Sequence, residues 1–281
     1  MTKLYWLLLA LLPLAAAQAQ DPEKGTKMDG YSLFRPVPRD SMRELHPDRP
    51  GITESPFTID PGHFQVEGDF LRLLTGRIEG ERHRTWRVAP LVLKVGLTDQ
   101  TDFQVALESY TIEKEWPQNE PQQRHSGFGD VTLRLKRNLI GDDDETRVAM
   151  AVTGFVRLPT GGSEGVGGSE MGIVVPINYH LAENWELTTQ LEGDRAYDRE
   201  DKQHYFQFVP GITTEHTFTD ALGVYGEVVG RWNARKNEWQ ATFNLGPEIK
   251  VGENIQFDMG ALLPLTSNTE REFFVGITVR I

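Results

Sequence analysis

The sequence of 281 residues contains no cysteine. Disulfide bonds, thiolate metal sites and a lipid-carrying N-terminal cysteine are therefore excluded. Basic residues are also in deficit, because 29 Lys and Arg stand against 41 Asp and Glu and give a formal net charge of −12. Nucleic-acid-binding proteins normally carry a basic surface, so we expect no nucleic-acid partner.

Long apolar runs are missing from all but the first residues. The mean hydropathy is −0.42, and beyond residue 20 no segment approaches the roughly 20 consecutive apolar residues that a helical membrane span needs. A membrane β-barrel needs only every second residue apolar, so a hydrophilic average is compatible with one. The 27 glycines and 16 prolines fit a chain of many strands and turns.

The N-terminus reads as a secretory signal peptide covering residues 1–19. Lys3 supplies the positive charge, residues 4–16 are apolar, and 17–19 form a small-residue cleavage site. The alternative is a retained membrane anchor. Residues 20–61 are polar and aperiodic, which predicts an extended N-terminal arm that either enters the barrel or lies in the periplasm. We expect export to the cell outer membrane.

Residues 62–281 show a repeated unit, clearest near the middle of the chain. From 131 to 139, valine and leucine alternate with threonine, arginine, lysine and asparagine, which is typical of a strand with one wet face. A short acidic turn at 141–145 follows, and the next strand ends at a glycine-rich loop, 159–169. Further loops are expected in other charged stretches, at 75–84, 113–126 and 195–203.

About twelve such strands follow one another, with short turns alternating with longer loops. The fold class predicted is all-β: an antiparallel transmembrane outer-membrane β-barrel with short periplasmic turns and longer extracellular loops. A soluble barrel of this size would place its apolar stripe inside and would need a large ligand or plug to fill the lumen. We therefore expect the apolar residues to face lipid.

Several short segments are arranged in an order that resembles a known family. The resemblance covers residues 48 to 281, and its segments are DRPGITESP at 48–56, GHFQVE at 62–67, LKVGLTD at 93–99, GFGD at 127–130 and LPTG at 158–161. The chain is similar to the outer-membrane "transporter" proteins labelled as phenol meta-pathway degradation proteins. The resemblance implies an outer-membrane barrel linked to uptake of aromatic or other small hydrophobic compounds, and it implies no catalytic residues.

Charged residues on the inward faces predict two walls across the lumen. The basic wall consists of Arg134, Lys136, Arg147 and Arg157. The acidic wall consists of Glu186, Glu192, Glu227, Glu248 and Asp258. Such walls can orient polar solutes, or the charges can instead pair with neighbouring strands. The arm residues Asp48, Arg49 and Glu54 are candidates for contacts inside the barrel, with a solvated linker as the alternative.

No motif predicts catalysis or a metal site. Residues 161–165 match the G-x-S-x-G pattern, but that motif needs a strand–turn–helix elbow, and here a flexible loop is expected that either points outward or narrows the pore. The seven histidines are scattered, and the acidic turn 142–145 lacks the spacing of a calcium loop. We expect neither an enzyme nor a cofactor.

The function predicted is passive uptake of small, aromatic or hydrophobic solutes through an outer-membrane channel. The expected partners are outer-membrane lipid, a small-molecule solute and, during biogenesis, the barrel-assembly machinery; the oligomeric state is left open. A closed structural or adhesive barrel is the first alternative. An outer-membrane lipid hydrolase is the second, although it would need a serine and a histidine side by side at the lipid boundary.

Overall fold

The computed structural model describes residues 30–78, 80–117, 121–142 and 146–281. The predicted signal peptide therefore lies outside the described residues. No helix among the described residues is long and apolar enough to cross a membrane. One short 3-10 turn, Arg39–Ser41, precedes a set of antiparallel strands. The strands are β1 Phe64–Ile78, β2 Glu81–Val88, β3 Leu91–Thr98, β4 Thr101–Leu107, β5 Tyr110–Trp116, β6 Gln123–Phe128, β7 Val131–Ile140, β8 Val148–Leu158, β9 Glu170–Ala182, β10 Trp185–Asp198, β11 Gln203–Thr219, β12 Leu222–Asn233, β13 Glu238–Lys250, β14 Ile255–Pro264 and β15 Arg271–Arg280.

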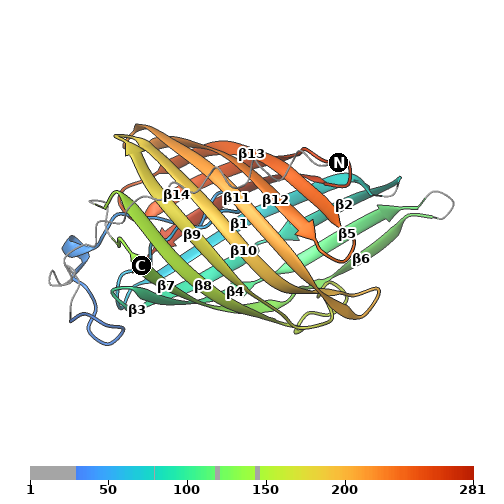
Figure 1. Ribbon diagram of the computed structural model, residues 1–281, viewed down its shortest axis with the longest axis horizontal. Coiled ribbons are helices and arrows are strands. Elements are labelled where there is room, and N and C mark those ends of the chain that lie inside the picture. Colours follow the sequence, from blue (N-terminus) through green and yellow to red (C-terminus); the bar gives the residue numbers. More distant parts are fainter. Residues whose placement is uncertain (1–29, 79, 118–120, 143–145) are drawn as a thin grey trace, which may run out of the picture.

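These fifteen segments form a closed barrel of twelve strands (Figure 1). Three of the twelve barrel strands are each interrupted once. Their two halves are β2 and β3, β4 and β5, and β6 and β7. The interruptions fall at 89–90, 108–109 and 129–130. Strand β1 pairs with β15 in antiparallel register and closes the ring. The prediction of a barrel of about twelve antiparallel strands is confirmed.

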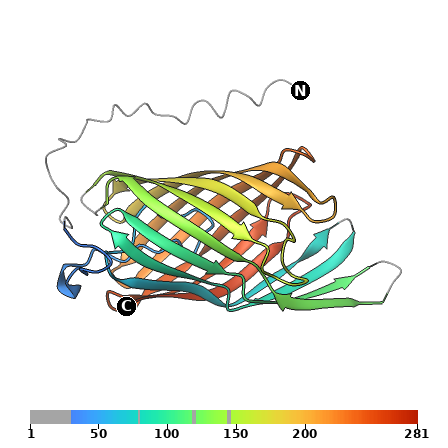
Figure 2. The same ribbon diagram turned by 90° about the horizontal axis from the view of Figure 1, so that it is seen from below.

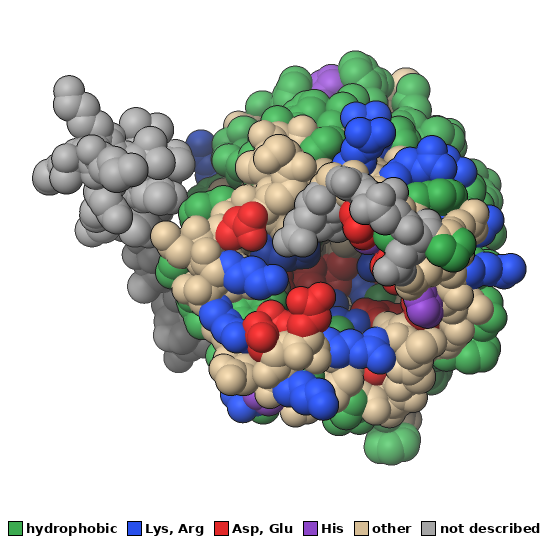
Figure 3. Space-filling view, turned by 90° about the vertical axis from the view of Figure 1, so that its right-hand side faces the viewer, with side chains coloured by type: hydrophobic (Ala, Val, Ile, Leu, Met, Phe, Trp, Pro, Cys, Tyr) green, Lys and Arg blue, Asp and Glu red, His purple; other side chains and the backbone are tan. Residues whose placement is uncertain are grey.

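The barrel is apolar outside and polar inside. Phe64, Leu135 and Val275 are 53%, 50% and 46% exposed on the outer face, whereas the inward-facing Lys136 and Gln104 are 1% and 0% exposed. Figure 3 looks into one end and shows charged side chains around a hollow, with hydrophobic side chains along the outside. A membrane β-barrel with a water-filled lumen requires a polar interior and an apolar exterior.

The two ends of the barrel differ. At the turn end, defined by the short connections 99–100, 183–184 and 220–221, the arm enters (Figure 2). The opposite end, which we call the loop end, carries the glycine-rich connection 159–169. At the loop end β2, β5 and β6 project beyond most of the barrel, together with the end of β1 that pairs with β2 (Figures 1 and 2). We call β2, β5 and β6 the flap.

The predicted loops 75–84, 113–126 and 195–203 are wrong in extent. The strands continue through most of each: β1 runs on to Ile78, β5 to Trp116, β6 starts at Gln123, and β10 reaches Asp198. These stretches carry charged or polar residues on both faces, so they lack the alternation that marks the rest of the barrel. Cross-strand hydrogen bonding, rather than an apolar stripe, continues the sheet there.

Candidate functional site

The arm passes through the lumen and pairs with both walls, beginning at Asp48. Its carboxylate lies 2.5 Å from Nζ of Lys94 on β3 and 2.6 Å from Nζ of Lys136 on β7. Lys94 also pairs with Glu67 on β1. Burial acts to raise the pKa of Asp48, but Lys136 and Lys94 together hold it well below its usual value. Asp48 is therefore a firmly ionised anchor between two buried lysines.

Arg49 reaches the opposite side of the lumen. Its Nη2 atom lies 2.6 Å from Oδ1 of Asp258 on β14 and 2.7 Å from Oδ1 of Asp69 on β1. Its Nε donates a second hydrogen bond, of 3.1 Å, to Oδ2 of Asp258. Both carboxylates are almost fully buried. This bidentate ion pair with Asp258 is among the strongest contacts that an arginine makes, because two parallel hydrogen bonds add to the attraction of opposite charges.

The backbone of the arm donates to Glu227 on β12. The amide of Ile52 lies 3.0 Å from each carboxylate oxygen, and the amide of Thr53 lies 2.6 Å from Oε1. The Thr213 hydroxyl donates a further bond of 3.0 Å. Gly51 allows this approach, since a Cβ atom there would lie only 2.7 Å from Oε1. Asn244 on β13 also donates to this carboxylate, so Glu227, which is 1% exposed, receives hydrogen bonds from two arm amides and two barrel side chains.

Glu54 completes the set of arm contacts. Its carboxylate pairs with Arg134 on β7, and its amide donates a 2.8 Å hydrogen bond to Oε1 of Gln190 on β10. Each of the three arm residues singled out from the sequence therefore meets a residue of opposite charge in the barrel. The acidic residues of the arm lie against the predicted basic wall, and its arginine lies against the acidic one.

The other predicted basic residues do not reach the arm. Arg157 pairs within the wall, with Glu108, Asp130 and Glu170. Arg147 precedes β8 at the turn end and is exposed. Of the four predicted basic residues, Arg134 and Lys136 are therefore the two that contact the arm among the described contacts.

The remaining acidic residues, Glu186, Glu192 and Glu248, form no hydrogen bond or ion pair with the arm among the described contacts. Glu186 accepts a 2.9 Å hydrogen bond from Asn178, and Glu192 accepts one of 3.0 Å from Gln190. Glu248 is the register partner of Asp258, and its Oε1 is buried without a hydrogen-bond partner among the described residues.

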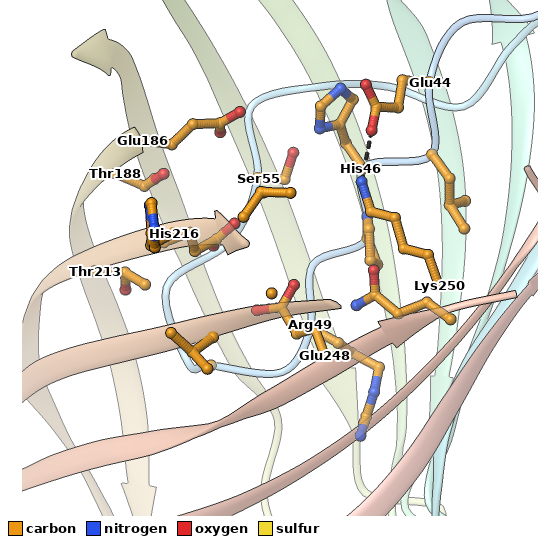
Figure 4. A pocket seen from close by; sticks show the side chains of 18 of the residues that line it. Glu44, His46, Arg49, Ser55, Glu186, Thr188, Thr213, His216, Glu248 and Lys250 are labelled. Carbon is orange, nitrogen blue, oxygen red and sulfur yellow. Dashed lines mark hydrogen bonds and ion pairs between the residues drawn. The ribbon is translucent and has the colours of Figure 1, made fainter. Parts of the chain in front are cut away.

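Cavities lie on both sides of the arm within the lumen. One of about 470 Å³ opens between the arm and Glu186, Glu248 and Lys250. Figure 4 shows Glu186 of β10 and Glu248 and Lys250 of β13 around this cavity, beside His46 and Ser55 of the arm. Another, of about 310 Å³, is lined by barrel residues including Arg72 and Arg87.

Arg49, Gly51 and Glu54 line both cavities. Arm segment 48–54 therefore lies between them, and in this conformation it narrows the lumen. The sequence did not single out Lys94, Glu67 or Asp69 as functional residues, although their alternating positions placed the latter two on an inward face.

The glycine-rich loop 159–169 is held by Asp130. The amides of Gly161 and Val166 each donate a 2.8 Å hydrogen bond to its carboxylate. Ser163 of the G-x-S-x-G sequence donates to the Ser126 carbonyl at 3.5 Å. The described contacts thus attach this loop to the start of β7 and to β6, and no described contact joins it to the arm.

The sequence and the fold both resemble known proteins. Residues 47–281 match the model of the family described as "Putative MetA-pathway of phenol degradation". The chain belongs to this family. The match begins one residue before Asp48, so the matched region includes residues 47–61 of the arm as well as the barrel. No curated protein matches the sequence.

Solved structures share the fold of this family member. An outer membrane channel from Pseudomonas putida F1 is 12% identical, with a TM-score of 0.62, over 83% of this chain and 99% of that chain. The beta domain of a Bordetella autotransporter is 9% identical, with a TM-score of 0.50, over 78% of this chain and 99% of that one. At these identities the likeness establishes the barrel fold.

Proposed function

We propose that this protein is an outer-membrane channel for the passive passage of small solutes, with arm segment 48–54 as its constriction. The observation that carries the proposal is a polar lumen inside an apolar, closed barrel, with a cavity on each side of the arm. The short turns would face the periplasm and the long loops the exterior, as in other outer-membrane barrels. Outer-membrane lipid then covers the outer face, and the barrel-assembly machinery inserts the chain.

The chemistry of the lumen favours solutes that carry a polar or ionised group. Lysine and arginine lie along β3 and β7, and carboxylates lie along β12 and β14, so a solute beside the arm meets a field across the pore. The cavity of about 470 Å³ is within the usual range for small-molecule sites, about 300–1,000 Å³. The description of the family adds aromatic compounds, and a small aromatic acid or phenol satisfies both criteria.

We infer transport rather than catalysis. The G-x-S-x-G sequence lies in the loop 159–169, not in a strand–turn–helix elbow. The Ser163 hydroxyl donates to the Ser126 carbonyl and to Glu164, and no histidine contacts it among the described residues. A serine without a general base is a weak nucleophile.

One observation favours a second candidate, a barrel that stays closed and serves a structural role. The arm pairs with both walls of the lumen through Asp48, Arg49 and Glu54. If these contacts never loosen, the cavities remain separate and no solute crosses.

Conductance of the purified full-length protein in a planar bilayer tests these alternatives. The channel proposal expects discrete single-channel events, and it expects liposomes containing the protein to admit benzoate faster than an uncharged sugar of similar size. The absence of both conductance and solute entry from a correctly folded protein would refute the channel and support the closed barrel.

A further inference from the structure

A histidine and two glutamates meet on the inner face of the flap. His83 of β2 is the register partner of Glu115 on β5, and Glu113 lies two residues away on the same face of β5. The Nδ1 atom of His83 lies 3.6 Å from Oε1 of Glu115. One ligand atom from each of the three side chains falls within 4.8 Å of the others. All three are only partly exposed.

A fourth carboxylate, that of Glu270, lies beside this cluster, and one of its oxygen atoms has no described hydrogen bond. Glu270 precedes β15, and its side chain covers Gly76, where a Cβ atom would lie 2.9 Å from Glu270 Cγ. Gly76 is the register partner of His83 on its other side. Glu270 interacts electrostatically with His83 and Glu113. Its Oε1 atom is buried and has no hydrogen-bond partner among the described residues.

An unsatisfied buried carboxylate oxygen is costly unless something binds it. Glu113 likewise has no described hydrogen bond to its carboxylate, and Glu115 and Glu113 project from the same face of one strand. The three carboxylates repel one another, and among the described residues only His83 and His125, the register partner of Glu113 on β6, oppose this repulsion at Glu113. His83 and Arg87 both interact electrostatically with Glu270, and neither forms a described ion pair with it. A cation between the four side chains would relieve both the repulsion and the missing contact.

We propose that His83, Glu113, Glu115 and Glu270 form a binding site for a divalent transition metal, with Zn²⁺ as the best match. An imidazole nitrogen combined with carboxylate oxygens suits Zn²⁺ and its neighbours in the first transition row, whereas Ca²⁺ takes oxygen ligands only. Neutral His83 and three carboxylates carry three negative charges, so a bound dication leaves one.

The position of the site gives it a mechanical consequence. His83 belongs to β2, the two glutamates to β5, and Glu270 to the connection between β14 and β15. A metal ion bound to all four would tie the flap to the seam at which the barrel closes. The inference therefore concerns the outer mouth and is separate from the arm constriction deep in the lumen.

Titration of the untagged, EDTA-treated full-length protein in detergent with Co²⁺, followed by visible absorption and then by Zn²⁺ competition, tests the site. We expect one equivalent of Co²⁺ per chain, displaced by Zn²⁺. His83→Ala and Glu113→Gln should each weaken binding at least tenfold, on the scale seen when metal-site residues are lost. His180→Ala is the matched control, because His180 pairs with Glu186 at the turn end, and its binding should equal that of the parent protein.

Folding of each variant is checked by the heat-dependent gel shift of barrel proteins, and Glu270→Gln provides a ligand change in a connection rather than a strand. The proposal is overturned if the parent protein binds Co²⁺ no more tightly than His83→Ala. It is also overturned if Ca²⁺ displaces Co²⁺ as readily as Zn²⁺ does, since the ligands would then be carboxylates alone. Neither outcome depends on conductance, so failure of the metal site leaves the channel proposal standing.

Discussion

Replacing Arg49 by alanine should release the arm from the lumen. Arg49 is bound to Asp258 through two hydrogen bonds, of 2.6 and 3.1 Å, and to Asp69 at 2.7 Å. The Arg49 side chain is 12% exposed and the two carboxyl side chains 0% and 2%. Truncation leaves the buried carboxylate of Asp258 without a counter-ion among the described residues, whereas Asp69 keeps its ion pair with Arg72 at 2.6 Å.

Breaking a buried ion pair in this way costs about 3–5 kcal/mol. Because about 1.4 kcal/mol corresponds to a tenfold change in an equilibrium constant, the ratio of released to bound arm should rise by roughly two to three and a half orders of magnitude. Arg49→Lys retains the charge but not the two-pronged geometry, so its effect should be intermediate.

Single-channel conductance and amide hydrogen exchange together measure this release. Arg49→Ala should show a larger mean conductance and faster exchange of the arm amides, whereas Arg137→Ala, which removes an exposed arginine bound only to Thr101 and Gln100, should match the parent protein. Unchanged exchange would refute the role of Arg49 in holding the arm. Faster exchange with unchanged conductance would refute the arm as the constriction.

Three further predictions concern the same region. Glu227→Gln weakens the acceptor for the arm backbone, so exchange of the Thr53 amide should accelerate about tenfold, by a loss of about 1.5 kcal/mol; an unchanged rate would contradict this. Gly96→Ala would place a Cβ atom 2.1 Å from the Asp60 carbonyl oxygen, so the variant should lose its gel shift or its arm protection, and a parent-like protein would contradict the packing. The pKa of Asp48 is lowered below its ordinary value of about 3.9, so its contribution to arm binding is complete above that value and declines only as pH falls below it; arm exchange that accelerates between pH 7 and 5 would argue against this anchor.

Most of the barrel could be predicted because lipid contact imposes a visible rule on the sequence. Where a barrel strand is covered by lipid, nearly every second residue is apolar, as in β15, and the pattern indicates both the strand and its inward face. The ends of β5 and β6 carry no such stripe and were predicted as loop. Their pairing depends on hydrogen bonds to neighbouring strands, which sequence periodicity does not report.

The side-chain contacts inside the lumen were harder to predict from the sequence than the barrel strands. Asp48, Arg49 and Glu54 could be chosen because charged residues in a proline-containing arm suggest contacts, but their partners could not, since many inward charges were available. His83 and Glu115 are 32 positions apart in the sequence, and only the register of β2 against β5 brings them together. No sequence motif marks that juxtaposition.

The aligned interruptions at 89–90, 108–109 and 129–130 set a limit on how deep the protein sits. Past this line, β6 pairs with β5 and with no other strand among the described residues. A strand edge with unpaired backbone groups is not tolerated in hydrocarbon, where no water can satisfy them. The hydrocarbon core of the membrane must therefore end at or before the three interruptions. Arg84, Lys114 and Arg124 of the flap then lie in the hydrated headgroup layer.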